Sequence, residues 1–366
     1  MLNLFPVGTE NRISVPIALI LLVAALPSWG ATWKVQLNYD KDASSLELHD
    51  LQCPSPKVCV AAGAIVDTAG NKDKVKGTVV FSSDGGSHWA FEDIPEVPES
   101  LFILNDSTGW IVTDKGIWQS VAVGRDWKKI SVKTGVERVW FLDQSHGFAI
   151  GVPKAIYETH DGGKAWTQIP ASNLPDSPTA TTSYDSIFFA GTMGLISGMI
   201  APENLNLSRS PLGAVLLASS DAGQTWESKP IRLNGRISCL RSLNEKSRVL
   251  AVVEYFGKSK FPTELFALDL DTLKTQPVFR QTDRVARDAI VLPDGQVLVA
   301  AVERMGELSE VPIPSKLKMM QSMDLETWLP ESSDYRAVAM RPILAAADAH
   351  NIWVATDTGM ILKRVE

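Results

Sequence analysis

The sequence predicts an all-β fold, a seven-bladed β-propeller with Asp-box repeats whose last blade is closed by the N-terminal strand. Two observations lead to this prediction. Three segments follow a single spacing rule, Ser/Thr-x-Asp-x-Gly-x-x-Trp, and a short apolar strand recurs seven times along the 366 residues. Units of four short strands separated by turn residues are typical of propeller blades.

The Asp boxes are expected to be structural turns rather than reactive sites. Clear copies occupy residues 82–89, 159–166 and 219–226. In such a box the Asp accepts hydrogen bonds from turn amides, the Gly permits a positive φ, and the Trp packs between sheets. The residues assigned to this structural role are Asp84, Gly86, Trp89, Asp161, Gly163, Trp166, Asp221, Gly223 and Trp226.

Weaker copies of the box continue the repeat. Residues 120–127 carry Ala122 in place of the Asp, residues 267–274 keep only Asp269, and residues 322–328 lack one position. The recurring apolar strands lie at residues 58–63, 109–113, 147–151, 194–198, 248–253, 295–301 and 351–356. The seventh unit ends one strand short, so residues 32–37, which carry Trp33, are expected to supply that strand. Such closure leaves no open sheet edge at the seam.

Residues 1–30 are expected to be a secretory signal peptide, and residues 31–366 a single propeller domain. Arg12 precedes an apolar run at residues 13–26, and small residues follow at Ser28 and Gly30. The alternative is a retained membrane anchor, but the run is shorter than the roughly 20 residues that cross a bilayer. The net charge of −7 is not the basic balance typical of nucleic-acid-binding proteins.

Two of the three cysteines are predicted to form a disulfide. Cys53 and Cys59 flank a short turn with two prolines, while Cys239 lies far away in the sequence. An oxidising compartment outside the cytoplasm would allow the first two to pair. The alternative is a pair of buried free thiols.

Antiparallel blades would separate the Asp-box turns from the longest loops. The Asp boxes connect strands 3 and 4 of a blade, whereas long insertions between strands 2 and 3 fall at residues 64–76, 199–212, 254–262 and 303–316. These two kinds of connection emerge on opposite faces. Long loops on a rigid frame commonly carry recognition, so the insertion side is the predicted binding face.

Four arginines are predicted to surround the mouth of the central channel on that face and to bind a partner. They are placed at the entry to the innermost strands of four blades, and they are Arg138, Arg236, Arg287 and Arg336. Guanidinium groups suit carboxylate or phosphate, so a negatively charged ligand is expected. The alternative is local pairing, with Glu137 and Asp288 as the neighbouring carboxylates.

The Asp boxes THDGGKAW and SSDGGSHW, together with the strands GWIVT and GFAIG, resemble the photosystem II stability and assembly factor family of Asp-box propellers. The resemblance covers about residues 31–366. In the photosynthetic members the propeller binds a newly made membrane subunit and assists its assembly. The resemblance therefore implies a non-catalytic factor that binds a membrane-protein client or an envelope complex. Its expected place is the periplasm, or the thylakoid lumen of a photosynthetic source, with peripheral membrane association allowed.

No catalytic, metal or cofactor site is expected. The five histidines show no metal-ligand spacing, and no Ser/His/Asp or Cys/His arrangement can be assembled. The alternative function is a sialidase-type glycoside hydrolase, because such enzymes use arginines on an Asp-box propeller to hold a sugar carboxylate. Its nucleophile would be Tyr335, beside Arg336 and near Glu331.

Overall fold

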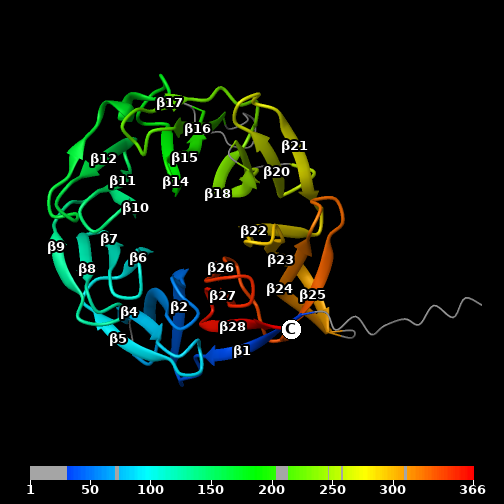
Figure 1. The fold of residues 1–366 in the computed structure, drawn as a ribbon. Coiled ribbons are helices and arrows are strands. Elements are labelled where there is room, and N and C mark those ends of the chain that lie inside the picture. Colours follow the sequence, from blue (N-terminus) through cyan, green and yellow to red (C-terminus); the bar gives the residue numbers. More distant parts are fainter. Residues whose placement is uncertain (1–30, 71–73, 203–212, 246, 257–258, 309–310) are drawn as a thin grey trace, which may run out of the picture.

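The computed structural model describes residues 31–70, 74–202, 213–245, 247–256, 259–308 and 311–366. The expected signal peptide at residues 1–30 lies outside these ranges. Within them, largely antiparallel sheets stand side by side around a ring, and edge strands of the sheets line its centre (Figure 1). The fold is an all-β propeller.

Five sheets have four strands each and follow one another along the chain. The first two comprise β2 (Ser44–Gln52), β3 (Cys59–Asp67), β4 (Lys74–Ser82) and β5 (Ala90–Ile94), then β6 (Pro98–Ile103), β7 (Gly109–Thr113), β8 (Gly116–Ser120) and β9 (Lys128–Ser131). The third comprises β10 (Val136–Phe141), β11 (Gly147–Gly151), β12 (Ala155–Thr159) and β13 (Thr167–Gln168), followed by a 3-10 helix (Pro170–Asn173). The last two comprise β14 (Thr182–Ala190), β15 (Met193–Ile200), β16 (Gly213–Ser219) and β17 (Glu227–Ser228), then β18 (Arg236–Glu245), β19 (Arg248–Glu254), β20 (Thr263–Asp269) and β21 (Thr275–Arg280).

An eight-stranded sheet completes the ring and joins the two ends of the described chain. One half comprises β22 (Arg284–Val291), β23 (Val297–Leu308), β24 (Val311–Ser322) and β25 (Leu329–Ser333), and the other β1 (Thr32–Asn38), β28 (Met360–Val365), β27 (Ile352–Ala355) and β26 (Ile343–Ala346). The first residue of β1 pairs antiparallel with Val365 of β28. A short parallel pairing of β1 with β25 links the halves.

The core lies between neighbouring sheets, because the middle strands are covered on both faces. Every residue of β7 is buried. Trp110 stacks on Phe141 of the next sheet, with ring centroids 3.6 Å apart. Ile111, the following residue, instead packs in a cluster with Val60 and Val79 of the preceding sheet. Because successive side chains of a strand point to opposite faces, consecutive apolar residues serve two different interfaces.

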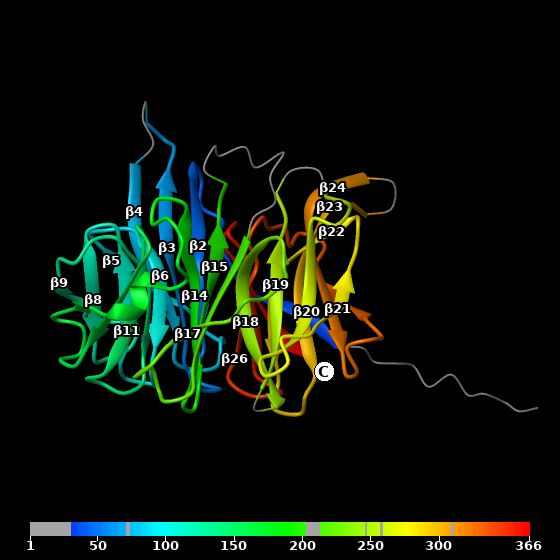
Figure 2. The same ribbon diagram turned by 90° about the horizontal axis from the view of Figure 1, so that it is seen from above.

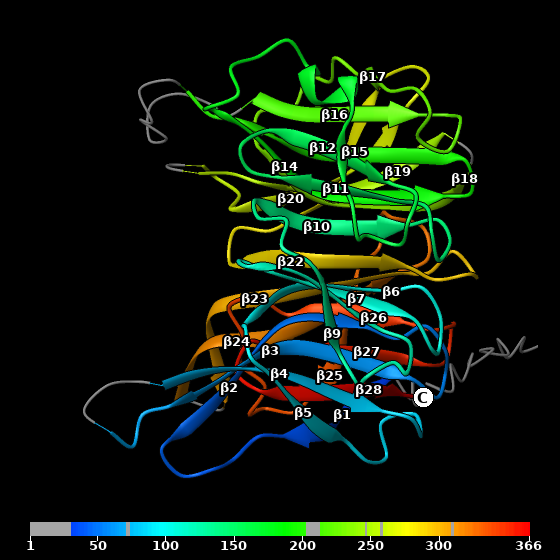
Figure 3. The same cartoon turned by 90° about the vertical axis from the view of Figure 1, so that its left-hand side faces the viewer.

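The two faces of the ring carry different connections. The ends of β3, β4, β23 and β24 extend beyond the ring on one side, which we call the insertion face (Figure 2). The turns that contain the Asp boxes lie on the other side, the Asp-box face, where the C-terminus also lies (Figure 3). No helix in the described ranges is long and apolar enough to span a membrane.

The prediction of long loops at residues 64–76 and 303–316 is wrong in extent. Strands β3 and β4 pair as far as Asp67 opposite Lys74, and β23 and β24 pair as far as Leu308 opposite Val311. Antiparallel pairing satisfies backbone N–H and C=O groups that an open loop would leave to water. These two insertions are therefore extended hairpins, which project from the insertion face.

Candidate functional site

The Asp-box carboxylates are engaged in turns on the Asp-box face. Ser82 Oγ donates to Asp84 Oδ1 (2.9 Å) and accepts from the Gly86 N–H (2.8 Å), while the same Asp oxygen accepts from the His88 N–H (2.9 Å). Corresponding bonds recur in three further boxes, around Asp161, Asp221 and Asp324. These hydrogen bonds hold the pKa of Asp84 at about 2, so its carboxylate stays ionised.

The glycines and tryptophans of the boxes complete the turns. The box glycines have φ of +90°, +93° and +90°, at Gly86, Gly163 and Gly223. The Trp166 indole N–H donates to the Gly163 carbonyl (2.9 Å), and its ring meets Phe141 edge-on. Trp226 meets Phe148 in the same way, and Trp89 packs against the core between the first and last sheets. Large aromatic side chains commonly pack in this way between elements of a core.

Six innermost strands have a register irregularity, and in two of them a carboxylate just after it reaches the next innermost strand. It occurs in β2, β6, β10, β14, β18 and β22. After it, Asp50 Oδ2 accepts from the Leu101 N–H (3.0 Å), and Asp288 Oδ2 accepts from the Leu344 N–H (2.9 Å). Asp50 therefore ties β2 to β6, the innermost strand of the next sheet. Asp288 ties β22 to β26, which is the other end strand of the same eight-stranded sheet.

Three of the four predicted arginines join one ionic network, which we call the channel cluster: Asp50, Arg138, Asp185, Arg236, Glu254 and Arg287. Arg138 lies 3.5 Å from Asp50 and donates from Nε to the Asp185 carbonyl (3.1 Å). Arg236 lies 3.1 Å from the Asp185 carboxylate and 4.0 Å from that of Glu254, which also accepts from Arg287 (3.2 Å). The network therefore crosses from the first to the sixth innermost strand.

The expectation of four arginines at equivalent positions is wrong. Arg138 follows the irregularity of β10, Arg236 is the first residue of β18, and Arg287 lies at the irregularity of β22. Arg336 precedes β26 (Ile343–Ala346) by several residues and pairs with Asp334 (2.9 Å). The first three arginines stand at different offsets from the irregularities of their strands, and Arg336 lies outside a strand. No local sequence pattern reveals these differences.

The partners of these arginines also differ from the expected ones. Asp288 pairs with Arg241 (3.2 Å), whereas Asp185 and Glu254 are the carboxylates that bind Arg236. Arg138, Arg236 and Arg287 nevertheless keep side-chain exposures of 46%, 35% and 30%. These three side chains are therefore paired and also partly exposed to solvent.

Burial dominates the electrostatics of the cluster's carboxylates. It raises the pKa of Asp50, although Arg138 opposes the shift, and it raises that of Asp185, although Arg236 opposes it. Burial and the nearby Asp185 likewise raise the pKa of Glu137. Desolvation disfavours a charged carboxylate unless a cation compensates. Acidic groups at least match the three arginines here, so the cluster is not a simple cationic site.

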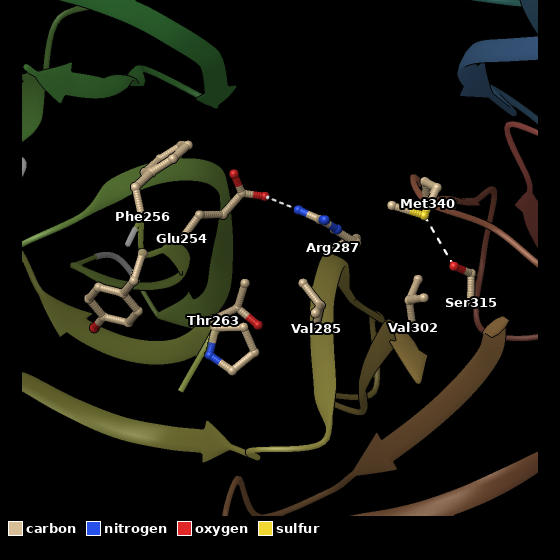
Figure 4. Close-up of a pocket in the computed structure, with 10 residues that line it drawn as sticks. Glu254, Phe256, Thr263, Val285, Arg287, Val302, Ser315 and Met340 are labelled. Carbon is tan, nitrogen blue, oxygen red and sulfur yellow. Dashed lines mark hydrogen bonds and ion pairs between the residues drawn. The ribbon is translucent and has the colours of Figure 1, made fainter. Parts of the chain in front are cut away.

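A cavity of about 440 Å³ opens beside the cluster on the insertion-face side of β19, β20 and β22 (Figure 4). Its walls include the Glu254–Arg287 ion pair together with Val285 and Val302. Phe256 and Met340, which are 41% and 56% exposed, also line it. The cavity thus combines an ion pair with accessible apolar surface, a combination that ligand-binding sites commonly have.

Part of this chain is similar in sequence to proteins of known function. Residues 119–247 match the family model "Photosynthesis system II assembly factor YCF48". A rice protein, photosystem II stability/assembly factor HCF136, is 32% identical over 116 residues, which are 31% of this chain and 24% of that protein. The chain resembles the photosystem II assembly factors. The photosystem II assembly lipoprotein Ycf48 of Synechococcus sp. (strain CC9902) is 34% identical over 102 residues, 27% of this chain and 26% of that protein.

The similarity in structure is wider than the similarity in sequence. A solved structure of "YCF48 bound to D1 peptide" has a TM-score of 0.61 and 14% identity, and the alignment covers 90% of this chain and 98% of that one. At this identity the likeness concerns the fold. The sequence matches span only about a quarter of the curated relatives' lengths. Of the candidate arginines, Arg138 and Arg236 lie inside the matched segment 119–247, and Arg287 and Arg336 lie outside it.

The residues considered for a sialidase-type mechanism are not assembled for it. Glu331 is buried, and its carboxylate accepts hydrogen bonds from the Trp33 indole (2.6 Å) and from Arg364 (2.8 and 2.9 Å). Tyr335 is 53% exposed. A carboxylate held by those donors is not available as a base for the tyrosine, so the proposed Tyr335–Glu331 pair is wrong.

Two further groups of chemically active side chains occur in the part of the chain that the structure describes. A disulfide joins Cys53 and Cys59, and Cys239 is a buried free thiol. His146, Glu158 and His160 gather on the Asp-box face, although the sequence spacing of the histidines suggested no metal ligands. Strand pairing brings these three together, which a pattern search along the chain does not detect.

Proposed function

We propose that this chain is a non-catalytic protein-binding factor that holds a segment of a membrane-protein client at the insertion face. The observation that carries the proposal is the continuity of the channel cluster with the cavity, because Glu254 and Arg287 belong to both. Such a site fixes a peptide through its polar groups and buries its apolar side chains. The likeness to photosystem II assembly factors supports a role in assembly.

The charges of the cluster favour a peptide over a small anion. Arg236 and Arg287 already bind carboxylates of the protein, so an anion would have to displace them. A peptide offers carbonyl acceptors and N–H donors together, and it satisfies both signs of charge. One of the similar structures holds a D1 peptide, which supports a peptide segment as the ligand here.

We propose that the ring has seven blades, with the eight-stranded sheet counted as two of them. β1 would then close the seventh blade as its fourth strand, and Trp33 would take the place that the box tryptophans hold elsewhere. The antiparallel pairing of β1 with β28 supports this count. A ring closed in this way is a stiff frame, which keeps the cavity and the cluster in fixed relative positions.

We infer that the protein works outside the cytoplasm after export directed by residues 1–30. The Cys53–Cys59 disulfide supports an oxidising compartment. The relatives described as a lipoprotein and as chloroplastic support the same kind of location. The client would be a membrane protein or an envelope complex encountered in that compartment.

The proposal is tested by co-purification with a matched pair of variants. Arg287→Gln combined with Phe256→Ala removes one cation and one exposed ring from the cavity. Lys164→Gln combined with Met323→Ala removes one cation and one exposed apolar side chain outside it. The full chain and both variants are used to capture proteins from detergent-solubilised envelopes, and the captured proteins are quantified by mass spectrometry.

The cavity variant should recover at least about tenfold less client than the wild type, because a hydrogen bond to a charged group contributes about 1.5 to 3 kcal/mol. The control variant should recover as much as the wild type, and both should melt within a few degrees of it. Equal recovery by the cavity variant would place the binding site elsewhere. A wild-type chain that captures no membrane protein would refute the client class.

A further inference from the structure

We propose that His146, Glu158 and His160 form a zinc-binding site at the Asp-box face. The site is independent of the channel cluster, which belongs to the innermost strands and the insertion face. It lies on the third sheet, where the turn before β11 meets the Asp-box turn after β12.

The register of β11 and β12 brings the three side chains to one place. Gly147 lies opposite Thr159, and Phe148 lies opposite Glu158. His146 and His160 each lie one residue beyond the Gly147–Thr159 pair, at the end of the two strands, and are therefore cross-strand neighbours. Glu158 stands two residues before His160, and residues two apart project on the same side of a strand. All three side chains accordingly point to one side of the hairpin.

The distances between the potential ligand atoms suit a small cation. Glu158 Oε1 lies 2.9 Å from His146 Nε2 and 3.5 Å from His160 Nε2. The two imidazole rings stack with centroids 4.7 Å apart, and the three ligand atoms all lie within 4.8 Å of one another. In tetrahedral zinc, bonds of about 2.0 to 2.2 Å place the ligand atoms roughly 3.4 Å apart. A small adjustment of the exposed His160 would therefore allow all three to bind one ion.

The donor set selects the class of metal. Two imidazole nitrogens and one carboxylate oxygen match the His₂Glu set of zinc sites with an open position, whereas Ca²⁺ and Mg²⁺ prefer oxygen ligands throughout. His160 is 71% exposed while His146 and Glu158 are each 24% exposed. The fourth coordination position therefore faces solvent, where water or a side chain of a partner protein can occupy it.

Both ligand-bearing turns are fixed by carboxylates that are not ligands. Asp143 Oδ1 accepts from the N–H groups of Ser145 and His146 (2.7 and 2.8 Å). Asp161 Oδ1 accepts from the N–H groups of Lys164 and Ala165 in the turn after His160. The backbone under each histidine is thus held before any metal arrives, which lowers the ordering cost of binding.

Metal binding to the untagged full chain tests the proposal. The metal-free protein is titrated with ZnCl₂ by calorimetry, and Co²⁺ is used as a coloured substitute whose visible spectrum reports tetrahedral coordination. The wild type should bind one Zn²⁺ per chain and show a higher melting temperature in its presence. His160→Ala, at an exposed position, should weaken binding more than about tenfold, since even indirect partners of a metal ligand contribute that much.

His88→Ala is the matched control, because His88 is an exposed histidine in the Asp-box turn of another sheet. This variant should bind Zn²⁺ as the wild type does. Glu158→Gln, which preserves the size of the side chain, should lose the tetrahedral Co²⁺ spectrum. Zinc affinity that is unchanged in His160→Ala, or no saturable binding by the wild type, would overturn the proposal.

Discussion

Asp161 and Asp185 show how one residue type serves two purposes in this protein. Asp161 lies in an exposed turn, where backbone N–H groups and Thr159 hold its pKa below the usual value. Asp185 is buried against Arg236, and burial raises its pKa. The turn carboxylate therefore stays charged and fixes local backbone. Asp185 stays charged only because Arg236 lies beside it. A ligand that moved Arg236 away from Asp185 would favour protonation of the Asp185 carboxylate.

The turn carboxylates should make the protein sensitive to acid. Hydrogen bonds within the turn lower the pKa of Asp221 from 3.8 to about 2, so the native state binds fewer protons than the unfolded state in this range. Its stabilising contribution is present above pH 4 and is lost between about pH 4 and pH 2. Asp221→Asn should therefore lower the melting temperature at pH 6 and make little difference near pH 2.

Thermal unfolding of wild type and Asp221→Asn across pH 2 to 6 measures this effect. The difference between the two proteins isolates the turn from groups such as Asp185, whose raised pKa acts in the opposite direction. A difference that stays constant down to pH 2 would show that the charge of Asp221 is not the source of its contribution.

At the scale of the element, the hairpin of β2 and β3 depends on its disulfide. Cys53 and Cys59 are only six positions apart, and both lie in the core cluster that joins the first sheet to the last, with Leu46 and Trp353. Closing so short a loop lowers the conformational entropy of the unfolded chain, which stabilises the native state by about 2 kcal/mol. Reduction, or replacement of both cysteines by serine, should lower the free energy of unfolding by about this amount.

Urea unfolding with and without reductant checks this prediction, and alkylation followed by mass spectrometry identifies the thiols. Burial raises the pKa of Cys239 to about 12, so this thiol should react only after unfolding. Alkylation of Cys53 in the native, unreduced protein would contradict the disulfide. An unchanged free energy of unfolding after reduction would contradict its stabilising role.

At the scale of the whole molecule, one buried hydrogen-bond network joins the first and last strands of the described chain, β1 and β28, to β25. The Trp33 indole on β1 donates to Glu331 on β25, and Arg364 on β28 donates to the same carboxylate from two nitrogens. The side chains of Glu331 and Arg364 are 0% and 6% exposed. Sequence positions that are 298 residues apart therefore meet in one hydrogen-bonded group.

Glu331→Ala should destabilise the protein by about 3 to 5 kcal/mol, because it leaves the Arg364 guanidinium buried without its carboxylate. The matched control is Asp334→Ala, which breaks the solvent-exposed pair with Arg336 and should change the free energy of unfolding much less, because exposed ion pairs contribute little. Chemical unfolding of the two variants measures both values. Similar losses in the two would mean that Glu331 does not hold the ring closed.

Deleting residues 31–38 tests the same closure at the scale of a strand. Without β1, β28 keeps β27 as a neighbour but loses its other antiparallel partner and the link to β25, and the apolar surface that Trp33 covers becomes exposed. The melting temperature should fall by many degrees, and the truncated protein should bind a fluorescent hydrophobic dye. A truncated chain that melts like the wild type would refute the closure of the ring by β1.

The sequence by itself determined the repeat and the all-β propeller. Turn residues and alternating apolar residues are local signals, and they act within a few positions of the chain. For this reason the box at residues 82–89 and the strand at residues 109–113 could be placed without a structure. The resemblance to photosystem II assembly factors likewise rested on short motifs, since these keep their spacing within each blade.

Only the tertiary structure decided which side chains share a site. A one-residue irregularity in an innermost strand changes which side chain reaches the neighbouring strand. Arg336 is separated from Arg138, Arg236 and Arg287 because it lies before β26 and pairs with Asp334. Glu331 is buried and bonds to Trp33 and Arg364, so it contributes to joining the ends of the chain. The pairing of β11 with β12 brings His146 beside His160. Such contacts depend on register and packing between segments distant in sequence, and no local pattern encodes them.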